Sequence, residues 1–227
     1  MQVMGGGHTA PFDVIVLAGG RGSRLGGVDK ATLELAGERL VDRVVRASRI
    51  AGAAQVIVVG PDSAGSGADV VLRERPEFAG PLAGIAAGIA VVTSPWVWVL
   101  ACDLEYPERV CTVLSKDHVA ASTAGRSAAD ADGTLLVDGS GRPQWLAANY
   151  RAAALAEACD HIGDEVVDAP VRRALEGLKL RELQVPTALA ADIDTPESLA
   201  NARMRAESEP RAEVGPRPGA DGPPASH

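Results

Sequence analysis

Four short runs of mainly apolar residues, separated by longer segments, constrain the fold of this chain more than any other feature. The runs cover residues 14–17, 55–59, 70–72 and 96–101. Apolar runs of this length are typical of strands that are buried on both faces. Two intervening segments, 40–50 and 81–92, have the spacing or composition of helices that pack against a sheet. Because strands alternate with helices, the sequence predicts an α/β fold, with a parallel sheet covered by helices on both faces.

The second half of the chain predicts further strands and helices. Three segments are predicted to form strands, of which the first two pair across a turn that contains Gly and Pro: 134–138, 145–150 and 179–185. Residues 119–122 are predicted to form one more strand. Helices are predicted over 152–158 and 170–177, and Thr195 followed by Pro196 predicts a last helix with Thr195 as its N-cap.

The length of the chain and the composition of its two ends predict a single domain with a flexible segment at each end. A chain of 227 residues, of which 46% are hydrophobic, is long enough for one α/β domain with a sizeable core. Residues 1–11 are glycine-rich and are predicted to be a flexible N-terminus. From residue 207 the chain is dominated by Pro, Gly, Ser and charged residues, so 207–227 are predicted to be a disordered tail. The predicted domain covers 12–206.

Charge and cysteine content exclude several classes of function. The net charge of −8 argues against binding of nucleic acid or of an anionic membrane through the overall field. The apolar stretches are far too short to span a bilayer. Three cysteines without C-x-x-C spacing argue against a zinc site or a disulfide framework: Cys102, Cys111 and Cys159. The first residues show no basic stretch followed by an apolar one, so we expect a cytoplasmic protein.

The segment that follows the first strand, residues 17–30, is built to bind phosphate. It contains five glycines and three cations, and Arg21, Arg24 and Lys30 outweigh Asp29. Glycine lets the backbone approach a ligand closely, and successive backbone N–H groups form an anion site to which the cations add charge. The segment does not match the Walker loop, because Val28 follows the last glycine pair, nor the G-x-G-x-x-G fingerprint. It predicts a polyphosphate clamp, with a flexible loop that caps a helix as the alternative.

Asp103, at the end of the fourth strand, is the best candidate for a metal ligand. In a parallel sheet, ligands bind outside the carboxyl ends of the strands, so Asp103 and the clamp are expected to share one crevice. A bound nucleoside triphosphate normally carries Mg²⁺, which takes one or two carboxylates together with phosphates and waters. Asp192 and Asp194 form a second acidic pair, and either of them could complete the metal site. The alternative is that both cap the turn before the last helix, and for Asp192 that alternative is preferred.

These segments together resemble a known family of nucleotidyltransferases. Residues 17–30 are similar to the signature of the molybdenum cofactor guanylyltransferases, the MobA family. Three further stretches fit in the same order: 80–84 (GPLAG), 101–103 (ACD) and 192–197 (DIDTPE). Residues 142–144 with 147–151 resemble the family segment that faces the acceptor. The resemblance spans about residues 13–203 and implies a Rossmann-like three-layer α/β/α sandwich with a mostly parallel sheet, of the nucleotide-diphospho-sugar transferase type.

The resemblance also implies a reaction. GTP and the molybdopterin-bound molybdenum cofactor are expected as substrates, with the guanine dinucleotide cofactor and pyrophosphate as products and Mg²⁺ as the cofactor. Molybdoenzymes or their chaperones are expected as further partners. Expected catalytic residues are Arg24, Lys30 and Asp103, and the expected metal ligands are Asp103 and Asp194. Expected nucleotide contacts come from Leu17, Ala18, Gly19, Gly20, Arg21, Gly22, Ser23, Lys30, Glu74 and Asp103.

The positions at which this sequence departs from the family pattern affect the expected choice of nucleobase more than the expected type of reaction. Gly60 falls near a position where many relatives carry a nucleotide-contacting Asn, and either Glu74 or Arg75 takes the position of the acidic residue that reads the base. Leu25 replaces the usual methionine, which is a mild change. Two alternatives stay open: a related nucleotidyltransferase that uses CTP or another phosphorylated acceptor, and a nucleotide-sensing protein that keeps the fold.

Overall fold

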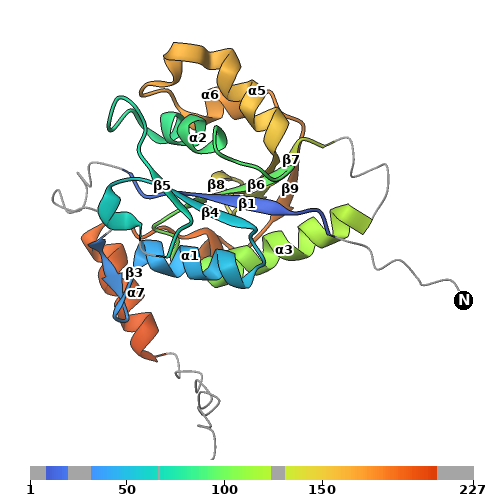
Figure 1. Cartoon of the computed structure of the whole chain (residues 1–227). Helices are drawn as coiled ribbons and strands as arrows, with labels where there is room; N and C mark the ends of the chain where they lie inside the picture. The colour runs from blue at the N-terminus through green and yellow to red at the C-terminus, as the bar shows by residue number, and fades with distance from the viewer. Residues whose placement is uncertain (1–8, 20–31, 66, 124–130, 209–227) are drawn as a thin grey trace, which may run out of the picture.

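The computed structural model describes residues 9–19, 32–65, 67–123 and 131–208, and a seven-stranded sheet forms its centre (Figure 1). In order across the sheet, the strands are β5 (Val70–Leu72), β4 (Gln55–Val59), β1 (Phe12–Leu17), β6 (Trp96–Ala101), β8 (Pro143–Arg151), β7 (Gly133–Val137) and β9 (Leu180–Gln184). β5, β4, β1 and β6 are parallel, β8 is antiparallel to β6 and β7, and β9 is parallel to β7. The predicted α/β fold with a mostly parallel sheet is confirmed.

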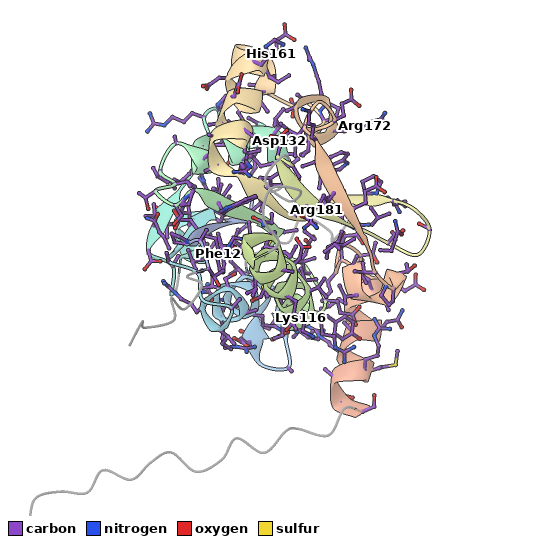
Figure 2. All side chains as sticks on the ribbon, turned by 90° about the vertical axis from the view of Figure 1, so that its right-hand side faces the viewer. Phe12, Lys116, Asp132, His161, Arg172 and Arg181 are labelled. Carbon is purple, nitrogen blue, oxygen red and sulfur yellow. The ribbon has the colours of Figure 1, made fainter. Side chains whose placement is uncertain are left out.

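Helices cover both faces of the sheet, as the alternation of elements predicts. In Figure 1 one layer below the sheet contains α1 (Leu40–Ile50), α3 (Pro107–Thr123) and α7 (Pro196–Ser208), and the layer above it contains α2 (Pro81–Ile89), α5 (Ala152–Ile162) and α6 (Val171–Leu175). Figure 2 shows the same layers from the side, with His161 and Arg172 at the top and Lys116 of α3 below. In the described part of the chain, every helix is too short or too polar to cross a membrane.

Shorter elements complete the chain. A two-residue hairpin, β2 (Glu34–Leu35) with β3 (Glu38–Arg39), precedes α1. Turns of 3₁₀-helix lie at η3 (Asp62–Ala64), η4 (Gly163–Val166) and η5 (Thr187–Ala190). Thr195 Oγ1 accepts a hydrogen bond from the backbone N–H of Ser198 at 3.0 Å, so Thr195 caps α7 as predicted.

The alternation of side chains along β1 divides the core into two layers. Phe12, Val14 and Val16 pack toward α1 and α3, and Ile15 and Leu17 pack toward α2 and α5. All of these side chains are buried. A strand with apolar residues on both faces therefore sits between two helix layers, which explains its continuous apolar run.

Small residues let α2 lie close to β1. A Cβ atom added to Gly88 would lie 2.9 Å from Ile15 Cγ2, and one added to Gly84 would lie 3.1 Å from Leu17 Cδ2. The glycines thus bring the helix backbone near the strand, and the N-terminus of α2 reaches the edge where β1 ends.

Two sequence expectations change with the structure. Residues 119–122, predicted as a strand, belong to α3, whose core face is formed by Val110, Leu114 and the buried His118. Helix α7 continues through Glu207 and Ser208, the first residues of the predicted tail. The rest of that tail and residues 1–8 of the predicted flexible N-terminus lie outside the described residues.

Candidate nucleotide-binding site

A cleft of about 440 Å³ opens at the edge of the sheet where β1, β4 and β6 end. Leu17, Val59 and Ala101, the last residues of these strands, line its floor. Leu146 of the antiparallel β8 also lines it, and Gly80, which caps α2, lines one wall together with Pro81 and Gly84 of that helix. The cleft therefore occupies the position at which ligands bind to open α/β sheets.

The chain leaves β1 directly into this cleft. Leu17 and Gly19 line it, while Ala18 is buried beside it and donates its backbone N–H to the carbonyl oxygen of Val59 at 2.8 Å. A side chain at Gly60 would approach Ala18 to within 3.0 Å, so Gly60 packs against the start of the predicted clamp. The remaining predicted clamp residues lie outside the described residues: Gly20, Arg21, Gly22, Ser23, Arg24 and Lys30.

Glu74 lines the cleft opposite the start of the clamp. Its side chain is only 6% exposed, and Oε1 accepts a hydrogen bond from the backbone N–H of Phe78 at 3.1 Å. A Cβ atom built on Gly19 would lie 3.5 Å from Oε1, so the carboxylate faces the backbone of that glycine. Arg75 is exposed and does not line the cleft. Of the two residues left open by the sequence, the structure brings Glu74 into the site.

Asp103 follows β6 and lines the cleft with an exposure of 8%. Its carbonyl oxygen accepts a hydrogen bond from the backbone N–H of Ile193 at 2.8 Å, which fastens the segment before α7 to this end of the sheet. Asp194 comes next in the chain, but it is not among the residues that line the cleft; its backbone N–H donates to Ser198 Oγ at 3.1 Å. The hydrogen bond between the backbones of Asp103 and Ile193 thus brings Asp194 near Asp103 in space. Of the two aspartates, Asp103 lines the cleft and Asp194 does not.

The carboxylates of the cleft suit a metal that arrives with a phosphate ligand. Among the described residues, no group of three or more His, Cys, Asp or Glu side chains is arranged to hold a metal ion. Mg²⁺ is usually held by one or two carboxylates and completes its shell with phosphate oxygens and waters. A single buried carboxylate that lines the cleft, as Asp103 provides, fits that donor set.

Two residues that were not predicted from the sequence form the outer wall of the cleft. Phe78 and Asp168 line the cleft, and both have a left-handed backbone, with φ of +62° and +53°. The backbone N–H of Asp168 donates to the carbonyl oxygen of Ala79 at 2.7 Å, and this bond joins the loop after α5 to the loop before α2. The two segments that contain these residues have no apolar periodicity from which a site could be predicted. The one unusual feature in the sequence is Phe78 itself, because the chain contains only two phenylalanines.

Comparisons with known proteins identify the family and the fold. The model of the MobA-like NTP transferase domain matches residues 14–181. A molybdenum cofactor guanylyltransferase of Pseudomonas putida is 33% identical over 176 residues, which cover 76% of this chain and 88% of that protein. A protein of the same name from Pseudomonas aeruginosa is 32% identical over 197 residues, or 85% and 95%. A solved nucleotidyl transferase from Methanothermobacter thermautotroptrophicus has the same fold, with a TM-score of 0.65 at 20% identity over 87% of this chain and 98% of that one.

Proposed function

The chain belongs to the MobA-like NTP transferase family, and on that premise we propose that it moves GMP from GTP to the molybdopterin-bound molybdenum cofactor and releases pyrophosphate. One observation carries the proposal. A single cleft is lined by the start of the glycine-rich segment at Gly19, by the buried carboxylate of Glu74 and by Asp103. This arrangement offers a phosphate site, a reader for a base edge and a carboxylate for a metal within one pocket.

The proposed reaction is one substitution at phosphorus. A phosphate oxygen of the acceptor attacks the α-phosphorus of GTP and forms a new P–O bond. The bond from the α-phosphorus to the bridging oxygen of the β-phosphate breaks, and its electron pair leaves with pyrophosphate. Most of the catalysis in such transfers comes from positioning and from stabilising the charge that develops.

Each predicted residue has a proposed part in this step. Arg24 and Lys30 neutralise the charge on the phosphates as the bond to the leaving group breaks. Glu74 accepts hydrogen bonds from the N–H groups of the guanine edge. Backbone groups hold the triphosphate along the loop, together with Ser23 Oγ and Arg21, and the proposed loop contacts are Leu17, Ala18, Gly19, Gly20 and Gly22.

Asp103 is the residue proposed to hold Mg²⁺, with Asp194 as the second ligand. A bound Mg²⁺ would supply positive charge next to the phosphate oxygens. Asp103 lines the cleft, which supports its role as a metal ligand. Asp194 does not line the cleft, so its role as the second ligand has less support. The three cysteines are free and buried, which fits the reducing cytoplasm that we propose for this protein. Transfer of the product to molybdoenzymes or their chaperones stays a prediction.

The test is a transfer assay with the full chain, GTP, Mg²⁺ and molybdenum cofactor. We expect pyrophosphate release that requires the acceptor, together with a guanine dinucleotide product that mass spectrometry detects. CTP in place of GTP serves as the matched control. If CTP supports turnover and GTP does not, the chain is a related nucleotidyltransferase with a different base. If both nucleotides bind and neither is consumed, the nucleotide-sensing alternative holds instead.

A further inference from the structure

The outer wall of the cleft contains an aromatic ring that the proposed reaction has not yet used. Phe78 is 44% exposed. Among the described residues that line the cleft, it is the one aromatic residue. Aromatic residues make up 3% of the chain, and the larger ones are mostly in the core, as Trp98 and Tyr150 are. An exposed phenylalanine at the mouth of a cleft is therefore unusual for this protein.

The backbone of Phe78 explains its position. With φ at +62°, the residue occupies a conformation that glycine adopts without penalty and that bulky residues rarely adopt. Positions that keep a large side chain in such a conformation are concentrated at functional sites. Phe78 also donates its backbone N–H to Glu74 Oε1 at 3.1 Å. One residue thus orients the buried carboxylate with its main chain and places a ring beside the same space.

An aromatic ring and a buried carboxylate that line the same cleft suit a planar heterocycle with N–H groups on its edge. The ring provides a face for stacking, which contributes about 1–3 kcal/mol per base when such platforms are truncated, or about 5- to 150-fold in affinity. Glu74 Oε1 accepts the hydrogen bond from Phe78, and the second carboxylate oxygen, Oε2, offers further acceptor sites. That oxygen remains able to accept hydrogen bonds from a ligand.

We propose that Phe78 contacts substrate directly, by stacking against a 2-amino-4-oxo-pyrimidine ring whose N–H edge Glu74 reads. The inference rests on the proposed function, because both of its substrates contain this ring: guanine in GTP and the pterin in the acceptor. Phe78 determines specificity for a planar heterocycle at this end of the cleft, and its main chain keeps Glu74 directed toward that ring.

The Phe78→Gly variant tests the role of the ring separately from the role of the backbone N–H. Glycine accepts the positive φ and keeps the N–H that Glu74 requires, so the variant loses only the ring and its melting temperature is expected not to fall. We expect ligand affinity to weaken about tenfold or more, with kcat at saturating substrate changed much less than KM. Phe78→Trp should restore binding because it restores an aromatic face. Ile50→Ala is the control, because Ile50 is an exposed apolar residue, at 75%, that does not line the cleft.

Two measurements identify the ring. Calorimetric titration with GTP alone reports on guanine, and the KM for molybdenum cofactor at saturating GTP reports on the pterin. A weaker Kd for GTP assigns the ring to guanine. An unchanged Kd with a raised acceptor KM assigns it to the pterin, and Glu74 then reads the pterin edge in place of the guanine edge proposed above. If a folded Phe78→Gly protein changes neither value while the wild type transfers GMP, the inference is overturned and the proposed function stands. If the wild type does not transfer GMP, the proposed function fails and this inference fails with it.

Discussion

The backbone N–H of Ile193 donates a hydrogen bond to the carbonyl oxygen of Asp103, with an N···O distance of 2.8 Å. The contact continues toward Glu105, because Leu104 and Asp192 form an antiparallel bridge and the N–H of Glu105 donates to the carbonyl oxygen of Ala191 at 2.9 Å. Ile193 itself is fully buried. The C-terminal part of the chain therefore holds in place the carboxylate that follows β6.

Asp103→Asn should lower kcat for pyrophosphate release by about 10²–10³-fold, because it removes a full charge from the proposed metal site. Asp194→Asn should cause a smaller loss, since Asp194 does not line the cleft. Titration of activity with Mg²⁺ measures both effects, and melting temperatures show that the variants fold. An equal loss in the two variants would contradict the leading role given to Asp103. Asp160→Asn, on the exposed face of α5, serves as the matched control.

Asp13→Ala should destabilise the fold by about 3 kcal/mol without a change in the nucleotide site. The Asp13 carboxylate is fully buried and accepts hydrogen bonds from the backbone N–H groups of Thr93 and Ser94, at 2.7 and 3.0 Å, and from Ser94 Oγ at 2.7 Å. Each of the two buried Ser94 donors, left without a partner, costs about 1–3 kcal/mol. Urea unfolding measures the loss. Asp13→Asn keeps one acceptor oxygen, so its loss should be smaller, and the prediction is wrong if the two variants are equally stable.

Gly88→Ala should destabilise the protein by about 1–2 kcal/mol, although alanine favours helix by about 1 kcal/mol. The new methyl group would lie 2.9 Å from Ile15 Cγ2. The cost should shrink in an Ile15→Ala background, where the clash is absent, and a double-mutant cycle by denaturant unfolding measures that coupling. Gly177→Ala, where a Cβ atom would meet nothing within 4 Å, should be close to neutral. Equal costs in both backgrounds would rule out the contact.

The thiols of Cys111 and Cys159 should react slowly with a disulfide reagent at pH 8 in the folded protein and rapidly after unfolding. Burial raises the pKa of Cys111 to about 12 and that of Cys159 to about 11, which keeps both thiols neutral. An exposed cysteine ionises near pH 8.5. The folded state thus binds these protons more tightly, so stability is unaffected below about pH 8 and declines as the pH rises further. Spectrophotometric thiol titration with and without denaturant is the check, and fast labelling of the native protein would contradict it.

Most of the sheet could be predicted from the sequence because its parallel strands are buried on both faces. Such strands leave uninterrupted apolar runs, as in 14–17 and 96–101. Helix α3 was harder to detect, because His118 occupies a core position four residues after Leu114 and eight after Val110. The polar residue interrupts the apolar period, and its burial depends on partners elsewhere: the Ala10 carbonyl oxygen, 2.7 Å from Nε2, and Asn149 Nδ2, 3.3 Å from Nδ1.

From local patterns alone the candidate site was predictable where it coincides with the end of a strand, and the family resemblance added Glu74. Leu17, Gly19 and Asp103 follow directly from that rule. Glu74, Phe78 and Asp168 come from irregular segments whose backbone conformations are set by contacts between loops, such as the bond from Asp168 N–H to the Ala79 carbonyl. No local pattern encodes such contacts, so the choice between Glu74 and its neighbour needed the fold.

The reversed direction of β8 has a consequence for how this protein can diversify. Because β8 runs against β6 and β7, the turn between β7 and β8, which includes Gly139 and Arg142, emerges at the same edge of the sheet as the nucleotide cleft. The residues that form the floor and the inner walls of the cleft come from earlier in the chain, apart from Leu146. An exchange of that turn can thus alter the rim of the cleft while the residues of its floor and inner walls stay the same.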